Sequence, residues 1–175
     1  MSLKDSIRTI PDFPKPGIMY RDITTLLADP KALKESIAQL AKALRAYEPD
    51  MIAGIEARGF IFGAAVAAEL GLGFIPVRKA GKLPHETYSQ DYELEYGTDT
   101  LEVHKDVMSK GARVVLVDDL IATGGTALAA AVLLRRAGAM IVAAGFVIDL
   151  PDLGGAQKLE AADISAISLV AYAGH

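Results

Sequence analysis

Residues 113–126 read Arg-Val-Val-Leu-Val-Asp-Asp-Leu-Ile-Ala-Thr-Gly-Gly-Thr, and they are the most informative part of the sequence for its architecture. Val114 to Val117 is an apolar, largely β-branched run, typical of a strand buried on both faces of a parallel sheet. Asp118 and Asp119 follow it, then a turn, and then an alanine- and leucine-rich helix. This order predicts an α/β fold, in which ligands lie beyond the carboxyl ends of the strands.

The turn from Ala122 to Thr126 has the composition of an anion site. Gly124 and Gly125 let the backbone turn tightly, with no Cβ in the way of a bound group. Thr123 and Thr126 add hydroxyl donors, and the first N–H groups and the dipole of the helix favour a phosphate. It is not a Walker loop, because no Gly-Lys-Ser/Thr follows. The preceding acids suit sugar hydroxyls, a metal ion or developing positive charge, so together these groups predict a phosphorylated ribose reacting at its anomeric carbon.

The overall composition is that of an ordinary globular protein. The 175 residues carry 18 Lys and Arg against 22 Asp and Glu, a net charge of −4, with no long basic run. This argues against nucleic acid or an anionic membrane as a main partner. There is no cysteine, no apolar start of the signal-peptide type and no run long enough to span a bilayer. We expect one domain, residues 1–175, in the cytoplasm.

A second strand, turn and helix should face the same crevice. Met51 to Ile55 is a short apolar strand, and a helix is expected from Phe60 to Leu70. Between them lie Glu56 and Arg58, at the carboxyl end of the strand. Arg58 is either a salt-bridge partner of Glu56 or a ligand of a diphosphate, for which the guanidinium fork is suited.

Two further segments carry candidate chemistry. Arg78, Lys79 and Lys82 place three cations within five residues, either as a solvated basic loop or as a clamp on an anionic leaving group. Residues 83–100 are polar and rich in tyrosine, which predicts a hairpin-like excursion and a lid that excludes water. The residues alone do not choose the acid or base among the lid's glutamates, which are Glu86, Glu93 and Glu95.

Several of these stretches resemble a known family. Val-Leu-Val-Asp-Asp-Leu-Ile-Ala-Thr-Gly-Gly-Thr resembles the phosphoribosyl-pyrophosphate-binding motif of the type I phosphoribosyltransferases. Asp-Phe-Pro-Lys-Pro-Gly-Ile and Tyr-Arg-Asp-Ile-Thr, within residues 12–24, match the N-terminal segment of the adenine phosphoribosyltransferases. Glu-Ala-Arg-Gly-Phe, Arg-Lys-x-Gly-Lys-Leu-Pro and Leu-Glu-Tyr-Gly follow in the family's order. The resemblance therefore covers nearly the whole chain.

The resemblance implies a type I phosphoribosyltransferase fold: a central, mostly parallel sheet flanked by helices, with an N-terminal hood over the purine at residues 1–30. It also implies a flexible catalytic loop at about residues 83–100. Backbone groups at Met19 and Arg21 would read the base edge. The ring of Tyr20, where phenylalanine is commoner in the family, would help to enclose the base.

The implied reaction converts adenine and phosphoribosyl pyrophosphate into AMP and pyrophosphate, in purine salvage. Mg²⁺ would be held mainly by substrate and water, with no direct protein ligand. The loop from Ala122 to Thr126 would hold the 5′-phosphate, and Asp118 and Asp119 would position the ribose hydroxyls. Glu95 would be the acid or base at purine N7, beside Tyr96. The expected pyrophosphate ligands are Arg58, Lys79, Lys82 and, from the other subunit of a homodimer, Arg78.

Two alternatives remain open at this stage. One is a sister phosphoribosyltransferase that uses guanine or xanthine, because recognition by backbone groups cannot be read from residue types. The other is a non-enzymatic regulator that binds phosphoribosyl pyrophosphate as a signal. Such a regulator is expected to carry a DNA-binding extension, and the sequence contains no basic helix of that kind.

Overall fold

The centre of the computed structural model is a seven-stranded sheet with the strand order β5-β6-β4-β3-β7-β8-β9. The structure describes residues 2–94 and 96–174. The strands are β3 (Met51–Ile55), β4 (Gly73–Lys79), β5 (Thr87–Glu93), β6 (Thr98–His104), β7 (Arg113–Ile121), β8 (Met140–Asp149) and β9 (Ser165–Ala171). Neighbouring strands run parallel from β4 through β9, whereas β6 is antiparallel to both β4 and β5. The prediction of a mostly parallel sheet is confirmed.

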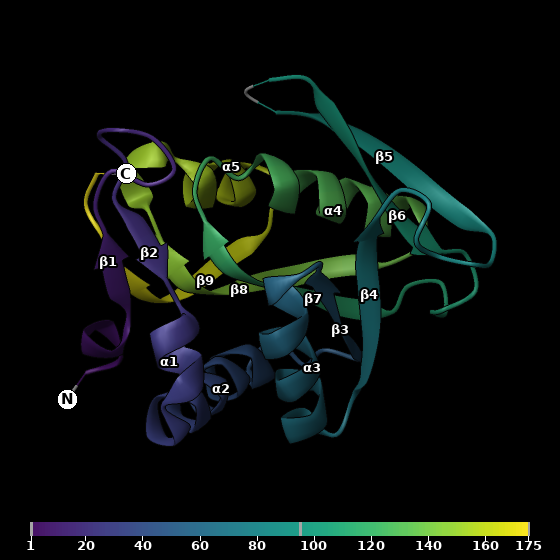
Figure 1. Cartoon of the computed structure of the whole chain (residues 1–175). Coiled ribbons are helices and arrows are strands. Elements are labelled where there is room, and N and C mark those ends of the chain that lie inside the picture. Colours follow the sequence, from purple (N-terminus) through teal and green to yellow (C-terminus); the bar gives the residue numbers. More distant parts are fainter. Residues whose placement is uncertain (1, 95, 175) are drawn as a thin grey trace.

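Helices cover both faces of this sheet (Figure 1). On one face lie α2 (Pro30–Arg45) and α3 (Arg58–Leu70), and on the other lie α4 (Gly125–Arg136) and α5 (Gly155–Ala161). Each face has its own apolar core: Leu40 and Phe62 belong to the first, and Leu133 and Leu159 to the second. No helix within the described ranges 2–94 and 96–174 is long and apolar enough to cross a membrane.

The predicted central strand is buried on both faces. Val114, Val115, Leu116 and Val117 are fully buried, and the residues alternate between the two cores. The strand β7 continues to Ile121, so Asp118 and Asp119 lie within the strand rather than after it. This extension is possible because β8 pairs with β7 as far as Ile121 and Asp149.

The helix boundaries follow the local sequence signals. Asp29 caps α2, because its Oδ1 accepts from the N–H groups of Lys31 and Ala32, and Pro30 occupies the first turn as predicted. The helix α3 begins at Arg58, two residues before the predicted Phe60. Arg58 is therefore the first residue of the helix and lies close to the carboxyl end of β3.

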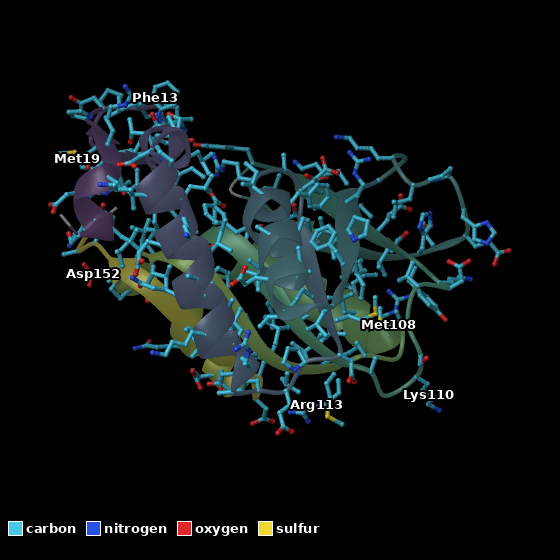
Figure 2. All side chains as sticks on the ribbon, turned by 90° about the horizontal axis from the view of Figure 1, so that it is seen from below. Phe13, Met19, Met108, Lys110, Arg113 and Asp152 are labelled. Carbon is cyan, nitrogen blue, oxygen red and sulfur yellow. The ribbon has the colours of Figure 1, made fainter. Side chains whose placement is uncertain are left out.

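The N-terminal segment (residues 2–28) forms a separate small layer at one end of the sheet (Figure 1). It contains η1 (Leu3–Ser6), β1 (Arg8–Ile10), β2 (Tyr20–Asp22) and the short helix α1 (Thr24–Ala28). The strands β1 and β2 pair antiparallel, and the proline-rich connection between them is not helical, as predicted. Helix α1 was not predicted. Figure 2 shows Phe13 and Met19 at the rim of this segment, pointing outward.

The polar excursion is a β-hairpin, as predicted. Strands β5 and β6 pair from Thr87 opposite His104 to Glu93 opposite Thr98. The Arg136 guanidinium of α4 donates to the Ser89 carbonyl, which fixes the β5–β6 hairpin to the helix at its base. The two strands of the hairpin run past α4 (Figure 1).

Candidate active site

A cleft of about 700 Å³ opens at the carboxyl ends of β3 and β7. These two strands are neighbours in the sheet, and the strand order reverses between them. From β3 the chain continues to β4 on one side of β3, whereas β7 lies on the other side. Such a point in an open parallel sheet is where ligands bind. The cleft wall includes Arg58 from the first strand–turn–helix unit and Asp118 from the second. The prediction that the two units share one crevice is confirmed.

The threonine–glycine loop (Ala122–Thr126) forms one wall of the cleft. Gly124 has a φ of +85°, which a residue with a side chain adopts only under strain, and α4 starts at Gly125. Among the residues that the structure describes, none accepts from the N–H groups of Thr123, Gly124 or Gly125. These donors and the N-terminus of α4 make the loop suited to a phosphate.

The two adjacent acids differ in their surroundings. Asp119 is buried, and its Oδ2 lies 2.7 Å from Nε of Arg58. The Oδ1 of Asp118 accepts from the Asp119 N–H at 2.9 Å. Burial, and then the neighbouring Asp119 carboxylate, raise the pKa of Asp118 well above its usual value. The site therefore combines one carboxylate paired with a cation and one carboxyl that resists ionisation.

Glu56 is not the partner of Arg58, so that interpretation of the sequence is wrong. The Glu56 carboxylate accepts from Lys82 Nζ at 2.7 Å and from the Lys79 N–H at 2.8 Å. The Arg78 Nε also donates to it, at 3.2 Å. Sequence proximity suggested the pairing with Arg58, whereas the register of β3 on β4 brings Glu56 to the loop after β4.

Each cation that lines the cleft has a carboxylate partner. Arg58 contacts Asp119, Lys82 contacts Glu56, and Lys79 Nζ lies 2.9 Å from Asp99 Oδ2. The bond to Asp99 raises the pKa of Lys79. The lysine side chains remain about half exposed, at 51% and 47%, so an entering anion can reach them.

The other predicted residues lie around the cleft rather than in its wall. Arg78 lies over the ring of Phe60, with its Cζ 5.8 Å from the ring centroid. Arg21 lies over the ring of Tyr172 at 4.1 Å, and the side chain of Met19 is exposed. Tyr20 reaches the site through its hydroxyl, which accepts from Arg58.

The tip of the hairpin meets the N-terminal segment. Lys15 Nζ lies 4.8 Å from the ring centroid of Tyr96, which is otherwise exposed. Glu95, the predicted acid or base, lies outside the described residues.

Sequence reasoning missed three residues of the hairpin. Tyr92 and Leu94 line the cleft, and Asp99 accepts from the Tyr92 hydroxyl at 3.5 Å as well as pairing with Lys79. The alternation along β5 was a usable signal, since Tyr88 and Tyr92 both pack against the core that includes α4. No local pattern indicated the partner of Lys79, because that contact depends on the antiparallel pairing of β6 with β4.

Comparisons with known proteins agree with this geometry. The phosphoribosyl transferase domain family matches residues 22–167. An adenine phosphoribosyltransferase of Bradyrhizobium sp. (strain ORS 278) is 58% identical, over 100% of this chain and 98% of the relative. The crystal structure of the enzyme from Thermoanaerobacter pseudethanolicus is similar with a TM-score of 0.92 and 54% identity, over 97% of this chain and 98% of that chain. A Saccharomyces cerevisiae adenine phosphoribosyltransferase, complexed with an imino-altritol bisphosphate and adenine, has a TM-score of 0.88 at 39% identity, over 96% of each chain.

Proposed function

The chain belongs to the phosphoribosyltransferase family, among the adenine phosphoribosyltransferases, and from this premise we propose how its cleft makes AMP from adenine and phosphoribosyl pyrophosphate. The reaction is a pentosyl transfer in purine salvage. One observation carries the assignment of roles: the threonine–glycine loop, Asp118 and Asp119, and the cleft cations lie in a single cleft. A phosphate, a ribose and a diphosphate need these groups side by side.

Each part of the sugar substrate has a matching group. The threonine–glycine loop holds the 5′-phosphate through its free N–H groups. Asp118 and Asp119 position the ribose hydroxyls. The pyrophosphate contacts Arg58, Lys79 and Lys82. The two lysines exchange their internal carboxylates for its oxygens, whereas Arg58 keeps its contact with Asp119 and offers its remaining N–H donors.

The chemical step is a substitution at the anomeric carbon. N9 of adenine forms a bond to C1′ while the bond from C1′ to pyrophosphate breaks, and the electron pair leaves with pyrophosphate. The carboxylate of Asp119 offsets positive charge that develops on the ribose. Glu95 accepts the proton from N7, and Tyr96 lies next to it in the sequence.

Mg²⁺ fits this site as a companion of the substrate. Within residues 2–94 and 96–174, no group of three or more metal-ligating side chains lies together. Asp119 is paired with Arg58, which leaves no set of protein oxygens for a complete coordination shell. The diphosphate and water would therefore supply the ligands, and the ion would lower the charge of the leaving group.

The remaining assignments concern the covers of the site and the setting of the enzyme. Residues 1–30 serve as the hood over adenine, where Met19 and Arg21 offer backbone groups and Tyr20 offers its ring. Residues from about 83 to 100 serve as the lid. The enzyme works as a homodimer, in which Arg78 approaches the other subunit's site, and in the cytoplasm, because its phosphorylated substrates do not cross membranes unaided.

A turnover assay with phosphoribosyl pyrophosphate and Mg²⁺ tests the function, with adenine, hypoxanthine, guanine and xanthine offered in parallel. Turnover of adenine alone supports the proposal, whereas turnover of another base instead keeps the reaction class and removes the purine assignment. No turnover with any base, together with tight calorimetric binding of phosphoribosyl pyrophosphate, would favour a regulator.

The role of Glu95 has its own test. Glu95→Ala is expected to abolish most turnover while phosphoribosyl pyrophosphate still binds, and Glu93→Ala, from the same lid, is the matched control. Equal turnover of Glu95→Ala and the wild type would remove the role.

A further inference from the structure

The Tyr20 hydroxyl contacts an active-site arginine that lies 38 positions away in the sequence. Arg58 Nη1 donates to this hydroxyl at 2.8 Å, while Arg58 Nε lies 2.7 Å from Asp119 Oδ2 in an ion pair. Tyr20, Arg58 and Asp119 thus form a chain that runs from β2 of the N-terminal segment to β7 of the central sheet. A phenylalanine at this position would lack the hydroxyl and could not make the first of these contacts.

Two contacts fix the guanidinium where a single one would leave it free to rotate. The Arg58 side chain is 53% exposed, so burial alone does not hold it in one orientation. A guanidinium has five N–H donors. With Nε on Asp119 and one Nη1 proton on Tyr20, the donors of Nη2 stay available to a ligand in the cleft that Arg58 lines. An arginine that is already oriented loses less conformational entropy when it binds an anion.

The tyrosine is itself held in place. The Phe13 ring meets the Tyr20 ring edge-on, with centroids 5.1 Å apart. Tyr20 also pairs with Ile10 in the β1–β2 sheet. At the other end of this sheet Arg8 pairs with Asp22, and their side chains form an ion pair. The hydroxyl is therefore presented by a fixed ring and not by a mobile one.

We propose that the Tyr20 hydroxyl is a positioning group for phosphoribosyl pyrophosphate, acting through Arg58, in addition to the contact of its ring with the base. The inference rests on the proposed function for the identity of the ligand. It assigns the two halves of one side chain to two substrates: the ring to adenine, and the hydroxyl to the arginine that faces the diphosphate.

Steady-state kinetics of Tyr20→Phe test this division. Because the hydroxyl acts on the ligand only through the half-exposed Arg58, its loss should have the effect of one ordinary hydrogen bond and raise KM for phosphoribosyl pyrophosphate about 3- to 10-fold. KM for adenine should change less than twofold, because the ring remains. Tyr172→Phe is the matched control, since the Tyr172 hydroxyl donates to the Lys4 carbonyl at 3.4 Å and does not accept from Arg58. A rise in KM for adenine alone, or equal rises for both substrates, would overturn the inference.

A double-mutant cycle separates positioning from a general loss of structure. In an Arg58→Ala background, Tyr20→Phe should cause no further rise in KM for phosphoribosyl pyrophosphate, because the group that it positions is gone. A full additional rise in that background would contradict the inference.

Calorimetric titration with phosphoribosyl pyrophosphate and Mg²⁺ gives a readout that needs no turnover. Weaker binding by Tyr20→Phe, with unchanged binding by Tyr172→Phe, supports the positioning role even if the wild type turned over no purine. Absence of adenine turnover would then count against the proposed function only. Equal binding by Tyr20→Phe and the wild type would count against the positioning role only.

Discussion

The N–H of Gly155 donates to the carbonyl oxygen of Ala122 at 3.0 Å, which joins the start of α5 to the threonine–glycine loop. The contact is close on both sides. A Cβ on Gly155 would lie 2.5 Å from the Ala122 oxygen and 2.8 Å from the Gly124 nitrogen, and a Cβ on Gly124 would lie 2.9 Å from Gly155 Cα. The C-terminal part of the chain therefore supports the loop that we assign to the 5′-phosphate.

Gly155→Ala should accordingly impair binding of the sugar phosphate. The added Cβ meets backbone atoms, which cannot rotate away, so the loop itself must move. We expect KM for phosphoribosyl pyrophosphate to rise at least about tenfold, the equivalent of about 1.4 kcal/mol, with a smaller change for adenine. Initial-rate kinetics with each substrate varied in turn measure both values.

Gly63→Ala is the matched control for this substitution. Its Cβ would lie 2.8 Å from Cε1 of the Phe74 ring, a similar overlap, but with a side chain that can turn. This variant should lose stability in thermal unfolding while keeping both KM values. If Gly155→Ala also kept both values, the loop would not depend on the support of α5.

Much of this arrangement follows from local sequence patterns. The apolar run of β7, the glycines of the turn and the Asp-Pro start of α2 are short-range signals, and they place the loop, the acids and the crevice correctly. The limits of prediction appear where two distant segments meet. Glu56 contacts Lys82 and Lys79 contacts Asp99 because of how β3, β4 and β6 lie side by side, and no local pattern carries that information.

The N-terminal segment shows the same limit in a different form. Pro14, Pro16 and Gly17 correctly predicted a non-helical path between β1 and β2. Helix α1 is only five residues long, from Thr24 to Ala28, which is too short to give a recognisable hydrophobic period. Its start depends instead on Asp22, whose Oδ1 accepts from the N–H and hydroxyl of Thr24.

Removing the partner of Lys79 should strengthen binding of the diphosphate. Lys79 has to leave Asp99 before it can contact pyrophosphate, and the pair is partly exposed, at 51% and 25%. Because solvent screens such a partly exposed pair, Asp99→Asn should lower KM for phosphoribosyl pyrophosphate only modestly, by up to about fivefold. Initial rates at saturating adenine measure the change.

Asp91→Asn is the control for Asp99→Asn. Asp91 lies on the same hairpin and accepts from the Thr100 hydroxyl at 2.6 Å, without a cation partner in the described structure. It should leave KM for phosphoribosyl pyrophosphate unchanged. A higher KM for Asp99→Asn would mean that Asp99 orients Lys79 for the ligand instead of competing with the ligand.

Asp22 should make the stability of the N-terminal segment depend on pH. The hydrogen bond from Arg8, followed by those from Thr24, lowers the pKa of Asp22 to about 2. A carboxylate with a lowered pKa stabilises the fold above its unfolded-state value of 3.8, and this contribution is lost as the pH falls toward about 2. Because the Arg8 side chain is 57% exposed and solvent screens the pair, we expect a contribution of about 1 kcal/mol.

Thermal unfolding of Asp22→Asn at a series of pH values measures this contribution. The variant should be less stable than the wild type at pH 7, and the difference should vanish near pH 2. Asp12→Asn is the control from the same segment, because it removes a carboxylate charge while its amide oxygen can still accept from the Gly17 N–H in the exposed turn. A difference between Asp22→Asn and the wild type that stayed constant with pH would show that the charge of Asp22 does not contribute.

The contribution of Asp118 to stability should depend on pH in the opposite direction to that of Asp22, because the pKa of Asp118 is raised. Burial and the Asp119 carboxylate disfavour its ionised form in the folded state. Stability is then greatest below the unfolded-state pKa of 3.8 and decreases as the pH rises through the folded-state value. Asp118→Asn, which cannot ionise, should therefore be more stable than the wild type at pH 7, by about 1 to 2 kcal/mol, as is common when one unfavourable group is removed. Thermal unfolding between pH 4 and 8 should show this advantage shrinking toward pH 4.

Asp118→Asn should also lose turnover, since Asp118 is assigned to the ribose hydroxyls. Higher stability together with lower turnover would indicate that the acid is kept for function. An acid retained at a cost in stability is typical of a functional position. Asp50→Asn is a useful comparison, because Asp50 accepts from the Arg113 N–H at the opposite end of β7, away from the cleft. It should lower stability and leave turnover unchanged. A loss of stability in Asp118→Asn at pH 7 would contradict this prediction. It would mean that the Asp118 carboxylate stabilises the fold through its contact with the Asp119 N–H, and the presence of an acid here would then need no functional explanation.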